Sequence, residues 1–141
     1  MSYCNLQLQN FKITIESQYS GNNRPELAVG TRFTPFGQYT KITPGRQEID
    51  QVLDLGQTDQ LRVLVRGLVP GDVVTIVDIE VSDITLQHYI YQGRQYQPAV
   101  TNYYQPGTEF HYDGVFELDI TLPVWRWIMN HIEREISDHR T

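Results

Sequence analysis

The segment "QLRVLVRGLVPGDVVTIVDIEV", Gln60 to Val81, contains two apolar runs separated by a single turn. In the first run Leu61, Val63 and Val65 alternate with other residues, which indicates a strand with one buried face. The second run, residues 72–81, is rich in β-branched side chains and starts apolar on both faces, as in a strand buried on both sides. The segment therefore predicts two strands and a β-rich fold.

The turn between these runs, "VPGD" at residues 69–72, has the composition of a type II turn. Pro70 fixes φ at the first central position, and Gly71 permits a positive φ at the second. A two-residue hairpin loop would pair Val63 with Asp78, an apolar residue with a charged one. One added loop residue would restore apolar pairs, and so would a crossover into another sheet. The sequence leaves these two alternatives open.

Alternating patterns continue on both sides of the central segment. They occur at residues 5–16, 26–33, 84–91 and 114–122. In the first of them the alternation changes phase between Gln9 and Asn10, which is the pattern that a β-bulge produces. Residues 47–55 fit either a strand or a helical turn.

The last segment of the chain has a different period. After Pro123, apolar residues recur every three or four positions, which predicts an amphipathic α-helix at about residues 124–138. Strands over about residues 5–122 and one C-terminal helix predict a mainly β fold, an antiparallel β-sandwich or jelly-roll-like domain. We expect one domain over residues 1–141, since the chain has the length of one ordinary domain.

Composition excludes several classes of partner. The net charge of −6 argues against binding to nucleic acid or to an anionic membrane, both of which need a basic surface. No stretch reaches the length of a membrane span. Cys4 is the one cysteine, so an internal disulfide is impossible. The first residues lack the pattern of a secretory signal, and we expect a location in the cytoplasm or in a virus particle assembled there.

Motifs for catalysis are missing from the sequence. It contains no nucleophile elbow, P-loop or dinucleotide-binding glycine motif, so we expect neither enzymatic activity nor a cofactor. Acidic residues that alternate along two strands are expected to form solvated faces without a metal. A weaker alternative is a cation site, which requires the two strands to be neighbours. Its candidate ligands are Asp78, Glu80, Asp83, Glu117 and Asp119.

The stretch "HYIYQGRQYQPAVTNYYQPGTEFHY", residues 88–112, holds six of the nine tyrosines and two charged residues, Arg94 and Glu109. Protein interfaces are enriched in tyrosine and depleted in charge. The main prediction is therefore a structural protein that forms a homo-oligomer, with other protein subunits as further partners, including a component of a virus or phage particle. The candidate interface or ligand-binding residues are Tyr89, Tyr91, Tyr96, Tyr103, Tyr104, Tyr112, Trp125 and Trp127.

Two other interpretations of this stretch remain open. The tyrosine rings can offer apolar faces to sugar CH groups while amide side chains bind the hydroxyls, so the alternative function is a carbohydrate-binding β-sandwich module. That alternative rests on an analogy between folds. The third interpretation is a connection packed on its own domain, with its tyrosines half-buried.

Overall fold

The computed structural model describes residues 7–19, 22, 25–56, 58–86, 89–97, 104–121 and 129. One group of strands comprises β1 (Gln7–Gln18), β4 (Gly45–Leu55), β6 (Val73–Val81), β7 (Ile84–Thr85) and β10 (Glu109–Phe110). The other comprises β2 (Glu26–Thr31), β3 (Thr40–Lys41), β5 (Thr58–Arg66), β8 (Arg94–Tyr96), β9 (Tyr104–Pro106) and β11 (Gly114–Thr121). A short 3-10 helix, η1 (Ile90–Gln92), precedes β8.

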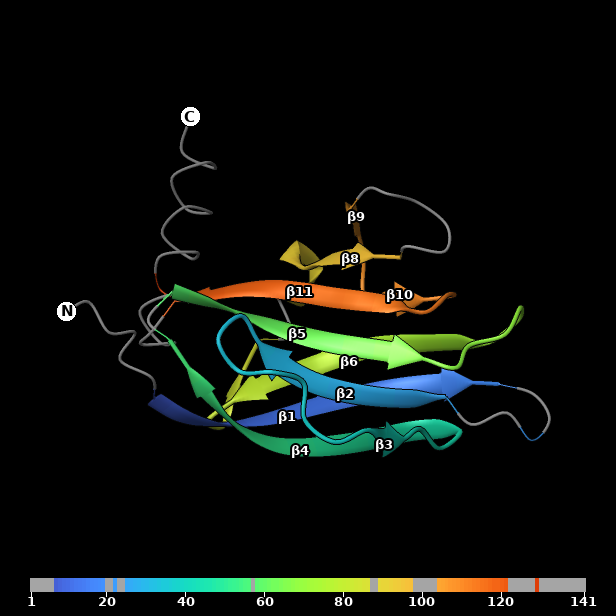
Figure 1. Ribbon diagram of the computed structural model, residues 1–141, viewed down its shortest axis with the longest axis horizontal. Helices are drawn as coiled ribbons and strands as arrows, with labels where there is room; N and C mark the ends of the chain where they lie inside the picture. Colours follow the sequence, from blue (N-terminus) through green and yellow to red (C-terminus); the bar gives the residue numbers. More distant parts are fainter. Residues whose placement is uncertain are drawn as a thin grey trace.

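These strands form two antiparallel sheets that face each other (Figure 1). The first sheet has the order β10-β6-β1-β4, with β7 paired to β6. The second has the order β3-β2-β5-β11-β8-β9. The prediction of a mainly β, antiparallel sandwich is confirmed. The helix expected at about residues 124–138 lies outside the described residues apart from Met129, so the structure gives it no support.

Apolar side chains from both sheets fill the space between them. Alternate residues of a strand point to the same side, so strands such as β4 and β11 contribute every second side chain to this core. The largest fully buried ones are Phe11, Phe110, Phe116, Ile13, Ile15, Leu27, Ile42, Leu55, Leu61, Ile76, Ile79 and Leu86. Removal of this surface from water is the main force that holds the two sheets together.

The central segment crosses from one sheet to the other. β5 lies in the second sheet and β6 in the first, so the crossover alternative is right. The connecting turn is of type II, because Gly71 has a φ of +96° and the Asp72 amide donates to the Val69 carbonyl at 3.0 Å. The crossover gives Val63 an apolar partner, Phe116, on the neighbouring strand β11.

Two details of the strands differ from or refine the sequence pattern. The predicted bulge at Gln9–Asn10 is wrong, because β1 pairs with β4 without interruption there. The pattern misled because Leu8 is 69% exposed and lies on the outer face. The irregularity lies further along β1, between Thr14 and Ile15 in the pairing with β6. Residues 47–55 belong to strand β4, which settles the ambiguity between strand and helix.

A search for membrane-spanning helices among the described residues found none of sufficient length and apolar character.

Candidate functional site

A cleft of about 700 Å³ opens on the outer face of the first sheet. Four of its residues form one row across the sheet, because Glu16 pairs with both Arg46 and Thr75, and Thr75 pairs with Glu109. The row therefore runs over β4, β1, β6 and β10. The cleft is lined by Glu16, Ser17, Gln18, Tyr19, Pro44, Gly45, Arg46, Val73, Thr75 and Glu109. Its volume lies within the usual range of small-molecule sites, roughly 300–1,000 Å³.

Charged groups in the cleft are paired but accessible. Arg46 Nη1 donates to Glu16 Oε1 at 3.3 Å, and His111 Nε2 lies 3.4 Å from Glu109 Oε1. All four side chains are more than half exposed. Exposed ion pairs of this kind contribute about 0–1 kcal/mol to stability. The fold therefore gains little from these four residues, and their polar atoms remain open to a ligand.

One wall of the cleft is fixed by hydrogen bonds to the backbone. The Tyr19 hydroxyl donates to the Ile42 carbonyl at 2.9 Å, and the Ser17 hydroxyl donates to the Thr43 carbonyl at 2.7 Å. The Tyr19 ring is partly buried against the hydrophobic core. These contacts tie the end of β1 to the segment before β4. The wall is thus formed before any ligand arrives, as is usual for small-molecule sites.

The groups that line the cleft combine charged, hydroxyl and aromatic side chains. Two carboxylates, a guanidinium and the hydroxyl of Thr75 can accept and donate several hydrogen bonds, while Tyr19 supplies an apolar surface. Glu16 and Glu109 are both more than half exposed and lie on strands that β6 separates.

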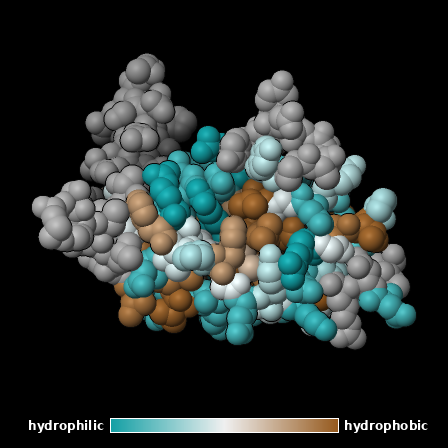
Figure 2. All heavy atoms as spheres, viewed as in Figure 1, coloured by the Kyte–Doolittle hydropathy of each residue, from teal (hydrophilic) through white to brown (hydrophobic). Residues whose placement is uncertain are grey.

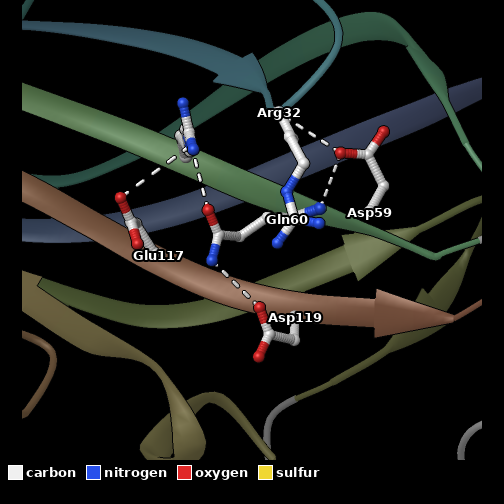
Figure 3. A network of polar contacts seen from close by, with 6 residues as sticks. Arg32, Asp59, Gln60, Glu117 and Asp119 are labelled. Carbon is white, nitrogen blue, oxygen red and sulfur yellow. Dashed lines mark hydrogen bonds and ion pairs between the residues drawn. The ribbon is translucent and has the colours of Figure 1, made fainter.

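The outer face of the second sheet carries a network of polar contacts (Figure 3). Gln60 Nε2 donates to Asp119 Oδ1 at 3.0 Å, and Arg62 Nε donates to Gln60 Oε1 at 3.0 Å. Arg62 Nε also lies 3.9 Å from Glu117 Oε1. Figure 2, which looks onto this sheet, shows hydrophilic side chains (teal) beside a band of hydrophobic ones (brown) at the centre of the face. The network joins β5 to β11 and has a structural role.

The carboxylate of Asp59, also drawn in Figure 3, holds several backbone segments together at this end of the sheet. Its carboxylate accepts hydrogen bonds from the backbone amides of Arg32 at 3.0 Å, Gly56 at 2.8 Å and Gln60 at 2.7 Å. The residue is only 1% exposed. Because several amides share one buried carboxylate, Asp59 fixes the loops that follow β2 and β4.

Among the described residues, the tyrosines named as interface or ligand-binding candidates are not all on the surface. Tyr89 is 7% exposed and belongs to the hydrophobic core, so it offers little surface to a partner or a ligand. Tyr91 and Tyr112 are exposed at 58% and 47%. Tyr96 on β8 is half-buried, and its backbone pairs with Tyr104 on β9. Three further candidates, Tyr103, Trp125 and Trp127, lie outside the described residues.

The residue that the tyrosine-rich stretch contributes to the cleft is Glu109, and Gln95 of the same stretch holds it in place. Gln95 is 2% exposed, and its side-chain amide donates to the carbonyls of Gly107 and Glu109, both at 2.8 Å. These bonds hold the strand that carries Glu109. Sequence reasoning missed Glu16, Arg46 and Glu109 as site residues, because antiparallel pairing brings them together from distant segments. The one available signal was that Glu109 is one of two charged residues in an otherwise uncharged stretch.

The structure does not assemble the alternative cation site. Asp78 and Glu80 lie on β6 of the first sheet, and Glu117 and Asp119 lie on β11 of the second. The hydrophobic core separates the two strands, so the condition that they be neighbours is not met. Asp83 lies in the turn after β6, with a φ of 70°. In the part of the chain that the structure describes, no three His, Cys, Asp or Glu residues are grouped so as to hold a metal ion.

Comparison with known proteins gives a fold likeness. No protein-family model and no curated protein matches the sequence. Among solved structures, the selenomethionine form of vCBM60 matches with a TM-score of 0.58 and 15% identity, over 77% of this chain and 88% of that one. Its description concerns a circular permutation that links two families of calcium-dependent carbohydrate binding modules. A second structure, vCBM60 in complex with galactobiose, matches with a TM-score of 0.56 and 15% identity, over 79% and 99% of the two chains. At this identity the likeness shows the β-sandwich fold.

Proposed function

We propose that the protein is a carbohydrate-binding β-sandwich module that holds its saccharide in the cleft on the first sheet. The observation that carries the proposal is the row of Arg46, Glu16, Thr75 and Glu109 beside the Tyr19 wall. The fold likeness to carbohydrate binding modules supports this function over the assembly function.

The chemistry of the row explains how a sugar would be held. Each carboxylate can accept hydrogen bonds from two neighbouring hydroxyl groups, and such charge-assisted bonds are roughly twice as strong as neutral ones. Arg46 presents several donors in a fixed plane, which suits hydroxyl and ring oxygens. The Tyr19 ring offers an apolar surface to the CH groups of a pyranose. We expect binding without turnover, since the carboxylates are solvated.

The described residues provide no calcium site for this mode of binding. The structural neighbours are described as calcium-dependent, whereas a calcium ion takes 6–8 oxygen ligands, several of them carboxylates. The described residues of this chain bring no three acidic or histidine side chains together around such a position. The donor set of the described part therefore does not fit the ion, and the proposal relies on direct side-chain contacts.

A glycan array followed by titration calorimetry tests the proposal. We expect Glu16→Ala to weaken saccharide binding at least about tenfold, because a charged hydrogen-bond partner is lost. Glu48→Ala is the matched control, since Glu48 is an equally exposed glutamate of the same sheet that does not line the cleft. The proposal fails if the wild-type protein binds no glycan, or if both substitutions weaken binding equally.

Assembly into a homo-oligomer remains a second proposal. It is favoured by the exposed rings of Tyr91 and Tyr112 in the tyrosine-rich stretch. A location in the cytoplasm or in a virus particle belongs to the same proposal. Light scattering tests it, and a mass of 16.4 kDa at every concentration would contradict it. If Tyr103 and Tyr104 anchor the interface, replacing both by alanine should dissociate the oligomer while glycan binding persists.

A further inference from the structure

Among the charged residues that line the cleft, carboxylates outnumber basic groups. Glu16 and Glu109 supply two negative charges, and Arg46 supplies one positive charge that Glu16 already neutralises at 3.3 Å. The contact of Glu109 is His111, at 3.4 Å, and an imidazole is charged only when it is protonated. The row of Arg46, Glu16, Thr75 and Glu109 therefore carries a net negative charge, and the carboxylate without a guanidinium partner in the row lies on the β10 side.

The surrounding face strengthens this negative potential. Further acidic residues point outward from the same sheet, on β4 and β6. They are Glu48, Asp50, Asp54, Asp78 and Glu80, of which Glu48 and Asp78, both paired with Thr14, lie nearest the row. Lys12 offsets part of this charge, since its Nζ lies 4.0 Å from Glu48 and 3.8 Å from Glu80. An acidic concave surface attracts cationic ligands and repels anionic ones.

We infer that the preferred saccharide of the cleft contains a hexosamine unit with a free, protonated amine, and that Glu109 is the carboxylate that receives the amine. This inference rests on the proposed function and names its substrate class. A protonated amine offers three donors and a positive charge to a carboxylate that has no guanidinium partner in the row. Glu16 is the weaker candidate for the amine, because Arg46 already pairs with it.

Three oligosaccharides of matched length and linkage serve as probes. They are a glucosamine oligomer, its N-acetylated form and a uronic acid oligomer, compared by titration calorimetry at about pH 7, where carboxylates are ionised and imidazoles are mostly neutral. We expect the glucosamine oligomer to bind at least about tenfold more tightly than the N-acetylated form, since a charged hydrogen bond exceeds a neutral one by a margin of that order. The uronic acid oligomer should bind most weakly.

Substitutions assign the preference to one residue. Glu109→Gln keeps the size of the side chain and removes its charge, so the affinities for the amine and the N-acetylated forms should come within about twofold of each other. Glu48→Gln, which changes the charge of the face equally outside the cleft, should leave the preference intact. Thermal melts of both variants should match that of the wild type, because both glutamates are exposed.

Each contrary outcome has a distinct meaning. If the N-acetylated form binds as tightly as the amine form, the inference is overturned while the proposed function stands. If Glu48→Gln abolishes the preference as fully as Glu109→Gln, the general charge of the face and not the cleft selects the ligand, and the assignment is wrong. If none of the three oligomers and no array glycan binds, the proposed function itself fails.

Discussion

The buried side-chain amide of Gln95, in the second sheet, donates a hydrogen bond of 2.8 Å to the backbone carbonyl of Glu109, in the first sheet. A second bond of the same length reaches the Gly107 carbonyl, and Gln97 Nε2 donates to Gln95 Oε1 at 2.7 Å. Glu109 in turn lines the cleft. One glutamine therefore links the stability of the sandwich to the geometry of the candidate site.

Gln95→Met should destabilise the protein and weaken its ligand binding together. Methionine has a similar length but no donor, so two partly buried carbonyls and the buried Gln97 amide lose their partner, at a cost of about 3 kcal/mol. For a domain of this size that is about 10 °C in melting temperature. Gln38→Met, at an exposed glutamine, is the control and should melt like the wild type. A melting temperature of Gln95→Met equal to that of the control would contradict the proposed link.

Asp59→Ala should cost about 3 kcal/mol, because three backbone amides lose their common acceptor in a buried position. Asp59→Asn should cost less, since the remaining oxygen can still accept two of the three bonds. Chemical denaturation measures both values. Asp50→Ala, on an exposed position of β4, should stay within about 0.5 kcal/mol of the wild type. Equal stability of Asp59→Ala and Asp50→Ala would show that the buried carboxylate does not fix these loops.

Gly93→Ala should destabilise the protein by about 1–3 kcal/mol through steric overlap. The backbone of Gly93 is extended, with φ −69° and ψ 159°, so alanine is allowed there. A Cβ at this position would, however, overlap the ring of the buried Phe116. Gly37→Ala is the control, because its Cβ would meet its nearest neighbour at 3.5 Å, an ordinary contact.

A double-mutant cycle isolates that overlap. Phe116→Leu removes the end of the ring, so the double variant with Gly93→Ala should be more stable than the sum of the two single effects by at least about 1 kcal/mol. Additive effects would mean that alanine at residue 93 is destabilising for a reason other than this ring.

The sequence predicts local structure well where one strand determines the pattern. Strict alternation at Leu61, Val63 and Val65 identifies β5, and the proline and glycine of "VPGD" identify a turn that the structure confirms. The choice between a hairpin and a crossover depends on partners elsewhere in the chain. The pattern could therefore exclude the simple two-residue hairpin but could not name Phe116 as the neighbour of Val63.

The errors of the sequence analysis arise because residue type and local pattern do not determine which side chains the tertiary packing buries. Leu8 reads as a core residue by its type, yet it lies outward, because exposed apolar side chains are common on protein surfaces. Tyr89 reads as a surface ring by its neighbours, yet it is buried. The cleft was not predictable, since Glu16 and Glu109 come to line it only through the register of the two strands on either side of β6.

The last prediction distinguishes the role of the Tyr19 hydroxyl from the role of the Tyr19 ring. Its hydroxyl donates to the Ile42 carbonyl, whereas its ring forms the apolar wall of the cleft. Tyr19→Phe removes only the hydrogen bond, so it should lower the melting temperature by about 4 °C, for about 1 kcal/mol, and change saccharide affinity less than about twofold. Tyr19→Ala removes the ring as well and should weaken binding at least about tenfold.

Tyr39→Ala is the matched control for the loss of a tyrosine ring. Tyr39 stacks on Arg66, whose Cζ lies 3.3 Å from the ring centroid, and it does not line the cleft. Its removal should therefore cost about 1 kcal/mol of stability and leave saccharide affinity unchanged. Calorimetry on the three variants decides the role of Tyr19. If Tyr19→Ala binds saccharide as tightly as Tyr39→Ala does, the ring is not a binding wall. If Tyr19→Phe already loses the affinity, the hydroxyl and its bond to the backbone, rather than the ring, shape the site.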